Sequence, residues 1–433
     1  MELYSENKQY KLYKGNMLDM LDVIEPNSID SIVTDPPYEL NFMNKSWDNS
    51  GIAFQRETWE KCLTVLKPGG HMLVFGGTKT YHRIACAIED AGFEIRDCIM
   101  YLYATGMPKA LNIGLAIDKK NGEEYKPSNI KNDWAGWFSS LKPSYEPIIV
   151  ARKPVDGSIV DNVLEYGVGG INIDECRVPL ELGYEQKTTL RKSRQDGNVF
   201  DNSSCGFKSE SNTVASANPS GRFPSNVIHD GSEEVVEMFP NRKGASSQNN
   251  YSNGHIYRGQ SLQESKTSLN GYREWYNDDG SAARFFYCAK ASKQDRDEGL
   301  DLFEEKKVYG DDMQWGYGNT EDDNFGDRVA NVKRRNTHPT VKPSSLMRYL
   351  VRLVTPKGGV VLDPFNGSGS TGKACMLENR ERNKNYKYIG IELTNEYLPI
   401  SKARIEYAID GEIPISDGDE GEKLLKFKEI KLF

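Results

Sequence analysis

Features that would mark a secreted, metal-binding or membrane-spanning protein are missing from this sequence. Its seven cysteines are scattered and never form a Cys-x-x-Cys pair, which argues against a disulfide framework and a zinc cluster. The five histidines have no spacing typical of metal ligands. No apolar run approaches the roughly 18 residues of a membrane span, and the amino terminus does not resemble a signal peptide. We therefore expect a cytoplasmic protein without a metal site.

An overall positive charge is also absent. The formal net charge is -8, which argues weakly against a protein that is basic over its whole surface, although segregated basic patches remain compatible with it. The 433 residues are 37% hydrophobic and 10% aromatic, enough for a sizeable core. This length allows one large domain with an insertion, or two to three domains.

Strand-like and helix-like patterns alternate at both ends of the chain. Near the amino terminus, strand composition at 11–16, 29–34, 71–75, 93–103 and 147–151 alternates with helical spacing at 54–66 and 81–90. Lys67 to Gly70 is expected to break the first of these helices. After Pro343 we expect a helix with an apolar face at Leu346, Leu350 and Leu353 that ends at Pro356, and a last helix over 394–409 that is capped by Thr394. Strands are expected over 359–363 and 388–393. This alternation predicts an α/β fold with a mostly parallel sheet covered on both faces.

The middle of the chain has a different composition. Asn, Ser and Gly dominate residues 193–220 and 244–271, and such stretches cannot bury much apolar area. The sequence therefore predicts a loop-rich domain over 155–335, inserted between two parts of a catalytic domain at 1–154 and 336–410. Residues 411–433 are expected to form an acidic tail.

The tetrapeptide Asp35-Pro36-Pro37-Tyr38 follows directly on the apolar run around Ile32 and Val33. Because neither proline can donate to a sheet ladder, the strand ends there, with Asp35 at its carboxyl end. Ligands of open α/β sheets bind at that edge. A carboxylate, rigid prolyl carbonyls and an aromatic ring would clamp a flat group that carries an amino substituent. The alternative is an ordinary turn.

A glycine-rich turn follows a second predicted strand, in the run Asp363-Pro364-Phe365-Asn366-Gly367-Ser368-Gly369. It is neither a Walker loop nor the six-residue dinucleotide fingerprint. Glycines here would let the backbone approach a ligand closely. Glu392 ends the next strand, where a carboxylate can accept hydrogen bonds from both hydroxyls of a ribose. A plain tight turn and a surface carboxylate are the alternatives.

Together, Asp35 to Tyr38 and Asp363 to Gly369 resemble the two signature motifs of DNA amino-methyltransferases. The resemblance implies a class I methyltransferase fold with a mixed seven-stranded sheet, in which 155–335 is the target-recognition domain. The catalytic motif comes first and too few residues precede it to hold a cofactor half, an order similar to the circularly permuted beta group. The similarity extends over nearly all of the chain and is strongest to enzymes of phages and prophages, which implies a bacterial or phage-infected cell.

This resemblance implies methyl transfer from S-adenosylmethionine to the exocyclic amino group of a flipped base in double-stranded DNA. Asp35 and the Pro36 carbonyl would accept the two amino hydrogens, mainly in the transition state. Tyr38 would stack on the base, so the catalytic residues are Asp35, Pro36, Pro37 and Tyr38. An aspartate at the head of the motif favours adenine-N6, and cytosine-N4 is the alternative. No metal and no covalent intermediate are needed.

The same resemblance assigns the cofactor site. The residues expected to bind S-adenosylmethionine are Asn16, Met17, Asp35, Lys342, Asp363, Pro364, Phe365, Asn366, Gly367, Ser368, Gly369 and Glu392. The family usually has Gly-Asp where this chain has Gly15-Asn16, and Asp19 is a weaker substitute than Asn16. Lys342 is the candidate for the cofactor carboxylate, the alternative being a solvated lysine before a helix.

Basic residues gather between 328 and 352, where no acidic residue intervenes. They are Arg328, Lys333, Arg334, Arg335, Lys342, Arg348 and Arg352. A basic strip beside the active edge could neutralise phosphates, although an ordinary solvated loop could contain the same residues. Expected DNA contacts are Lys333, Arg334, Arg335, Arg191, Lys192 and Arg194.

Double-stranded DNA is thus the expected partner, and a second copy of the chain and a cognate restriction endonuclease are further candidates. Two other functions stay open. One is a methyltransferase that acts on RNA or protein. The other is a catalytically silent DNA-binding protein with the same fold, which Asn16 in place of aspartate would fit. The target sequence is not readable from the insert.

Overall fold

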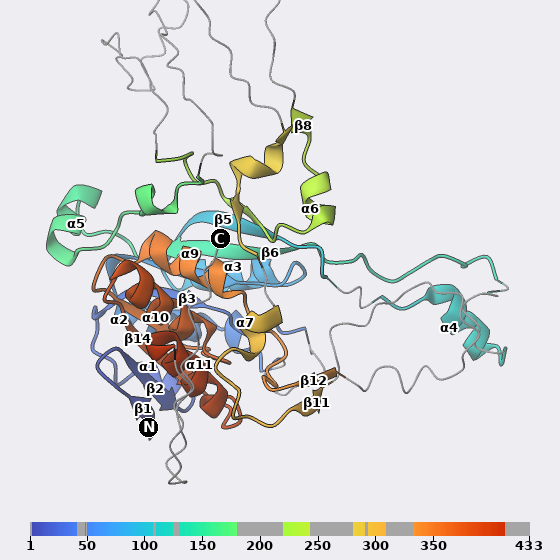
Figure 1. Cartoon of the computed structure of the whole chain (residues 1–433), viewed down its shortest axis with the longest axis horizontal. Helices are drawn as coiled ribbons and strands as arrows, with labels where there is room; N and C mark the ends of the chain where they lie inside the picture. The colour runs from blue at the N-terminus through green and yellow to red at the C-terminus, as the bar shows by residue number, and fades with distance from the viewer. Residues whose placement is uncertain are drawn as a thin grey trace, which may run out of the picture.

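A ten-stranded mixed sheet forms the centre of the molecule (Figure 1). The computed structural model describes residues 2–40, 48, 50–106, 110–123, 130, 132–179, 220–242, 280–290, 293–308 and 332–411. In spatial order the strands are β1 (Glu2–Glu6), β2 (Tyr10–Lys14), β14 (Lys387–Glu392), β13 (Val360–Asp363), β3 (Ile29–Thr34), β4 (Leu66–Phe75), β6 (Tyr145–Arg152), β5 (Glu94–Leu102), β7 (Val227–His229) and β10 (Tyr287–Cys288). The α/β prediction is confirmed.

The predicted count of seven strands was wrong. The strands that the sequence pattern indicated are the central ones, which in spatial order are β2, β14, β13, β3, β4, β6 and β5. At one edge, β1 pairs with β2 as an additional antiparallel strand. At the other edge, β7 and β10 continue the sheet with only three and two residues. Strands this short show no alternation that a sequence pattern could detect.

The direction of the strands decides which residues meet. β2, β14, β13, β3 and β4 run parallel to one another, so their carboxyl ends lie along one edge of the sheet. β6 runs antiparallel to both β4 and β5. The amino end of β6 therefore lies at the same edge of the sheet as the carboxyl ends of the five parallel strands.

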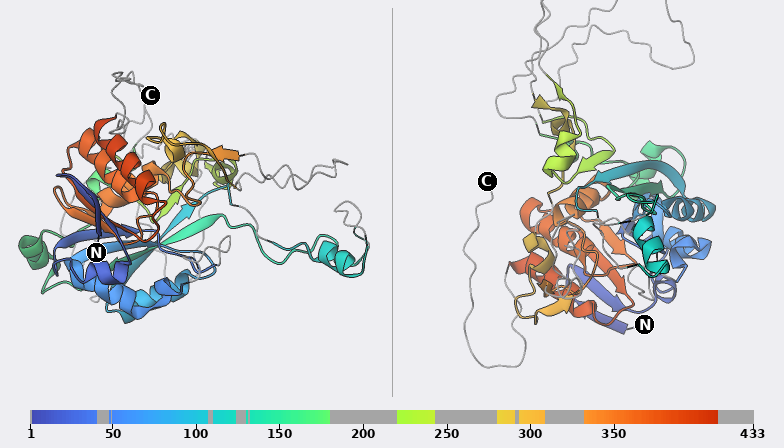
Figure 2. Two further views of the ribbon diagram at one scale, coloured as in Figure 1. Left: turned by 90° about the horizontal axis from the view of Figure 1, so that it is seen from below. Right: turned by 90° about the vertical axis from the view of Figure 1, so that its right-hand side faces the viewer.

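Helices cover both faces of the sheet, as Figure 2 shows from below. One face carries α1 (Met17–Leu21), α2 (Arg56–Val65) and α3 (Tyr81–Asp90), whose buried side chains, such as Trp59, share a core with β3 and β4. The other face carries α9 (Ser344–Val354), α10 (Ser370–Arg382) and α11 (Leu398–Asp410). All six residues of β3 are buried, because helices lie above and below it.

Two helix boundaries differ from the prediction. Residues Lys67 to Gly70 do follow the end of α2, but they belong to β4, which starts at Leu66. The last helix begins at Leu398 instead of 394. Tyr397 is its N-cap, so Thr394 does not cap it; the Thr394 N–H donates to the Glu392 carboxylate. Pro399 lies in the first turn, where a missing N–H is tolerated.

The described parts of the predicted insert are attached to the main sheet. β7 and β10 pair with the edge of the main sheet, and α5 (Ile159–Tyr166) is tied to it by Asn162, which donates to the carbonyls of Pro68 and Val168. Two-stranded ribbons join β8 (Asn241–Arg242) to β9 (Gly280–Ser281) and β11 (Lys306–Val308) to β12 (Val332–Arg334). The proposed domain boundaries stay a prediction, and the tail beyond 411 lies outside the described residues.

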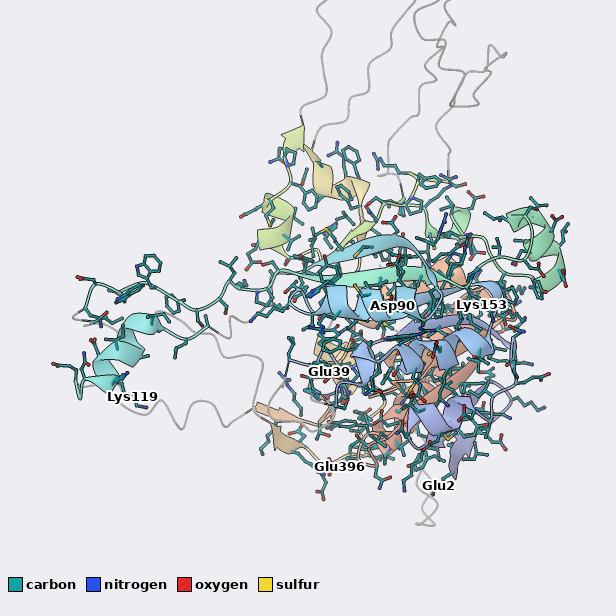
Figure 3. The ribbon with its side chains drawn as sticks, turned by 180° about the vertical axis from the view of Figure 1, so that it is seen from behind. Glu2, Glu39, Asp90, Lys119, Lys153 and Glu396 are labelled. Atoms are coloured by element: carbon teal, nitrogen blue, oxygen red, sulfur yellow. The ribbon has the colours of Figure 1, made fainter. Side chains whose placement is uncertain are left out.

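An arm between β5 and β6 extends away from the body and carries α4 (Ile113–Lys120) (Figures 1 and 2). In Figure 3, Lys119 marks α4 far from Asp90 and Lys153 on the body. Among the described helices, none combines the length and apolar character that a bilayer crossing requires.

Candidate active site

One cavity of about 830 Å³ lies at the edge where β3, β13 and β14 end and β6 begins. Its size suits a small molecule or cofactor. Most of the predicted catalytic and cofactor residues line it, namely Asn16, Met17, Asp35, Pro36, Pro37, Tyr38, Lys342, Asp363, Pro364, Phe365, Asn366, Gly367, Ser368 and Glu392. The structure therefore brings the two candidate motifs together, because β3 and β13 are adjacent strands.

The Asp35 carboxylate is held from both sides. Its Oδ1 accepts a hydrogen bond of 2.8 Å from the Tyr38 hydroxyl, and its Oδ2 lies 2.9 Å from Lys342 Nζ. Asp48 fixes the loop that follows by accepting from the backbone N–H groups of Glu39 and Leu40. Each Asp35 oxygen still has a lone pair for another donor.

Lys342 lies between two carboxylates and is only 7% exposed. Its Nζ is 2.9 Å from Asp35 Oδ2, 3.4 Å from Glu146 Oε2 and 3.1 Å from the Tyr38 hydroxyl oxygen. Burial alone would lower the pKa of Lys342, but the two carboxylates more than offset this and raise it. These three contacts match the three donors of an ammonium group. The predicted contact of Lys342 with the cofactor carboxylate stays a prediction.

Glu146 was not among the predicted site residues. It lies near the amino end of β6 and lines the cavity. Burial raises the pKa of its carboxyl group despite the nearby Lys342. The sequence indicated a strand here, but only its antiparallel direction places Glu146 at the active edge.

The glycine-rich loop needs its glycines at two positions. Gly367 and Gly369 have φ angles of +51° and +75°, in the left-handed region that side chains disfavour. A Cβ atom at Gly367 would lie 2.8 Å from His338 Nε2, and one at Gly369 would collide with Ser401. The loop therefore passes close to its neighbours, and Gly369 caps α10 without itself lining the cavity.

Asp363 ties the loop to β3. Its carboxylate accepts hydrogen bonds of 2.7 Å from the hydroxyls of both Thr34 and Thr371, and one of 3.1 Å from the Phe365 N–H. Burial raises its pKa to about 6. Through these hydrogen bonds, Asp363 fixes the conformation of the loop at its start.

Glu392 closes the same loop from β14. Its Oε2 accepts from the Gly367 N–H and its Oε1 from the Thr394 N–H, both at 2.7 Å. Burial raises the pKa of this carboxyl group to about 7. Each oxygen retains a lone pair on the cavity wall, so the predicted contact with ribose hydroxyls stays a prediction that the geometry allows.

Asn16 is the N-cap of α1. Its Oδ1 accepts from the Leu18 N–H at 3.0 Å, and the preceding Gly15 N–H donates to the Glu392 carbonyl. The side-chain oxygen of Asn16 therefore caps the helix, whereas its amide nitrogen Nδ2 takes no part in this hydrogen bond.

His338 and Arg404 support the loop and were also missed by sequence reasoning. The His338 ring lies edge-on to Tyr397 at 4.5 Å, and burial lowers the pKa of His338 to about 3, which keeps it neutral. Arg404 is buried in α11 and donates to the Ser368 carbonyl at 2.7 Å and to its hydroxyl at 2.9 Å. Burial lowers the pKa of Arg404 to about 10.

The predicted basic strip is not a continuous free surface. Arg348 and Arg352 both bind Glu378 of α10, at 2.8 Å and 2.9 Å, and Arg352 is buried. Acids distant in sequence thus neutralise basic residues that have no acid near them along the chain. Lys333 is exposed on β12, whereas Arg335 lies 3.4 Å from Asp301.

Arg191, Lys192 and Arg194 lie outside the described residues. Within the part of the chain that the structure describes, no cluster of three or more His, Cys, Asp or Glu side chains is placed to hold a metal ion.

A carboxylate motif and a glycine-rich loop that share one cavity, at the edge of an α/β sheet, are typical of an enzyme that binds a nucleotide-like cofactor. The family model for DNA methylase matches residues 29–403, so the chain belongs to this N6/N4 DNA methylase family. Its methyl donor is S-adenosylmethionine, as predicted.

Curated relatives match over shorter stretches. The Type II methyltransferase M.HindIII of Haemophilus influenzae is 23% identical over 205 residues, 37% of this chain and 64% of that protein. The Type II methyltransferase M2.MboI of Moraxella bovis is 43% identical over 72 residues, 17% of this chain and 24% of that protein. DNA adenine methyltransferase YhdJ of Escherichia coli is 37% identical over 71 residues, 16% and 22% of the two chains. The chain thus spans less than two thirds of each of these relatives.

Among solved structures, the cytosine-N4-specific PvuII DNA methyltransferase aligns over 95% of this chain and 98% of its own, at 13% identity and a TM-score of 0.42. The complex of M1.HpyAVI with S-adenosylmethionine aligns at 14% identity and a TM-score of 0.34, over 92% and 98% of the two chains.

The cavity fits S-adenosylmethionine by its own features. Gly367 contributes only backbone to the wall, and Phe365, Met17 and Ile391 supply apolar walls for a flat ring. Glu392 offers acceptors for hydroxyl groups on the same wall.

Proposed function

We propose that this protein is a site-specific DNA methyltransferase that methylates the exocyclic amino group of a flipped base, most favourably adenine-N6. One observation carries the proposal: Asp35 and the glycine-rich loop line the same cavity. An acceptor for amino hydrogens thus faces the binding place of a methyl donor.

The residues suit this chemistry. An exocyclic amino group conjugated with its ring is a poor nucleophile, because its lone pair is delocalised. Acceptance of its hydrogens by Asp35 and the Pro36 carbonyl would localise the lone pair, and this stabilisation grows toward the transition state. The cofactor supplies an electrophilic methyl group. Tyr38 would lie against the base while its hydroxyl keeps Asp35 oriented.

The base has to leave the duplex to reach Asp35, at a cost of roughly a few kcal/mol. Lys333 and Arg334 on the ribbon of β11 and β12 are proposed phosphate contacts. The insert at 155–335 is proposed as the source of sequence specificity.

The chain order supports a class I methyltransferase fold in the circularly permuted arrangement of the beta group. Asp35 follows β3 and the cofactor loop follows β13, which is late in the chain yet lies beside β3. Adenine is favoured over cytosine because aspartate heads the motif. A cytoplasmic location, a phage or prophage source, a homodimer and a partner restriction endonuclease stay predictions of the sequence.

Transfer of a labelled methyl group tests the proposal. The purified full chain is incubated with labelled S-adenosylmethionine and, separately, duplex DNA, RNA and protein, and the DNA is digested to nucleosides. We expect N6-methyladenine in duplex DNA, and no transfer by Asp35→Ala with cofactor binding retained. Asp22→Ala is the matched control, because Asp22 forms only an exposed pair with Lys61.

Each alternative predicts another outcome. N4-methylcytosine would identify the other member of the N6/N4 pair. Transfer only to RNA or protein would refute a DNA substrate, and duplex binding without cofactor binding would indicate a silent homologue. Full transfer by Asp35→Ala would contradict the role of Asp35.

A further inference from the structure

Four side chains from three separate segments form one charged cluster at the catalytic end of the cavity. Asp35 and Tyr38 come from the loop after β3, Lys342 precedes α9, and Glu146 comes from β6. Glu146 belongs to neither sequence motif, yet its carboxylate shares Lys342 with Asp35.

We propose that Glu146 is a positioning residue for Asp35 and the final acceptor of the proton that methyl transfer releases. This inference rests on the proposed amino-methyltransferase function and adds a residue and a proton route to it.

The positioning part follows from charge balance. A lysine bound only to Asp35 would draw electron density from that carboxylate and weaken it as an acceptor for the amino group. Because Lys342 also lies 3.4 Å from Glu146 Oε2, its positive charge is divided between two carboxylates. Loss of the Glu146 charge would leave Lys342 entirely on Asp35.

The proton part follows from the reaction itself. When the amino nitrogen bonds the methyl carbon, the bond from that carbon to sulfur breaks, and the nitrogen becomes positively charged until it loses a proton. Asp35 accepts this proton. Lys342 then gives one of its own protons to Glu146, and the neutral amine left behind takes the proton from Asp35, which is again a carboxylate. At the end Glu146 carries the proton, Lys342 is unchanged, and the cavity leads from Glu146 to solvent.

Other titratable groups near Glu146 do not compete for this proton. The facing groups are Asp35, Tyr38, Tyr101, Tyr103 and Lys342. Burial raises the pKa of each of these tyrosines, so they stay neutral, and the carboxylates raise the pKa of Lys342. Glu146, whose pKa is raised by burial, is therefore well suited to hold a proton.

Glu146→Gln tests the inference, since glutamine keeps the size and an acceptor oxygen but cannot take the proton. Single-turnover methyl transfer to duplex DNA is measured over a range of pH, with cofactor binding followed by calorimetry. We expect a rate on the order of tenfold to hundredfold lower, with unchanged cofactor affinity. The wild-type rate should fall on acidification as Glu146 becomes protonated, and in the variant this limb should move to lower pH.

Two further variants separate this role from a structural one. Glu146→Asp keeps the charge and should recover part of the rate together with the wild-type acid limb. Glu94→Gln breaks the pair with Arg152 at the far end of β5 and β6 and should change neither rate nor pH profile.

The outcomes distinguish the two proposals. An active wild type with an unaffected rate and pH profile in Glu146→Gln would overturn this inference alone. Loss of cofactor affinity with an unshifted pH profile would overturn it too, because that pattern indicates a structural role. A wild type that transfers no methyl group to DNA would overturn the proposed function and this inference with it.

Discussion

The two ends of the cavity use carboxylates in opposite ways. At the catalytic end, Asp35 and Glu146 share the ammonium group of Lys342 and keep lone pairs directed at the cavity. At the loop end, Asp363 and Glu392 accept hydrogen bonds from hydroxyls and backbone N–H groups that build the wall itself. Ion pairs with a lysine thus prepare one end for a reaction, whereas hydrogen bonds from uncharged donors shape the other.

The most severe change expected is in the rate of Asp35→Asn. Asparagine keeps an acceptor oxygen but leaves Lys342 without one of its two carboxylates, so we expect transfer to fall by roughly 100-fold to 1,000-fold. The urea midpoint should change little, because Asp35 is on the cavity wall. Single-turnover assays measure the rate and urea titrations measure the stability. A large fall in the urea midpoint together with the rate would contradict the contrast between the two ends.

At the loop end the expected loss is in stability. Asp363→Ala removes the acceptor of the buried Thr34 hydroxyl and the nearer of two acceptors of the Thr371 hydroxyl, and we expect the free energy of unfolding to fall by about 2 kcal/mol. Urea unfolding measures it. Thr34→Val in the same background is a useful control, since removing the hydroxyl that lost its acceptor should recover part of the loss, whereas the Thr371 hydroxyl can still donate to the Val33 carbonyl at 3.2 Å. An unchanged urea midpoint in Asp363→Ala would contradict the role of Asp363 in stabilising the loop.

The pH dependence of stability should report Glu392. Its pKa is raised from the ordinary value to about 7, so the folded state holds a proton that the unfolded state has released. The stabilisation from this group is therefore present below about pH 4.5 and is lost as the pH rises through 7. Relative to Glu392→Gln, the wild type should lose about 2 kcal/mol between pH 5 and pH 7. Parallel curves in urea titrations at these two pH values would refute this.

The smallest expected effect separates backbone strain from close packing. Gly369 and Gly358 both have positive φ angles, but an added Cβ would meet Ser401 at Gly369 and nothing within 4 Å at Gly358. Each alanine substitution should lower the free energy of unfolding by roughly 1 kcal/mol because of backbone strain. Gly369→Ala should lower it by about 1 kcal/mol more because of the collision with Ser401. Equal thermal midpoints would mean that Ser401 moves aside without cost.

Local patterns predicted much of the fold and the two motifs. Helix α3 has the predicted bounds, and the strands before Asp35 and Asp363 lie where the apolar runs placed them. Periodicity works there because each element buries a face of its own. It failed for β7 and β10, which are too short to have a period and depend on pairing with β5 and with each other.

The sequence by itself determined that a carboxylate with two prolines and a glycine-rich turn each end a buried strand, because these features depend on neighbouring residues. Tertiary structure decided that Lys342 meets Glu146 and that Arg352 meets Glu378. It also decided that Asp363 and Glu392 are loop-building carboxylates. Such pairs depend on strand order and direction, which bring distant residues within hydrogen-bond range and which no local pattern contains.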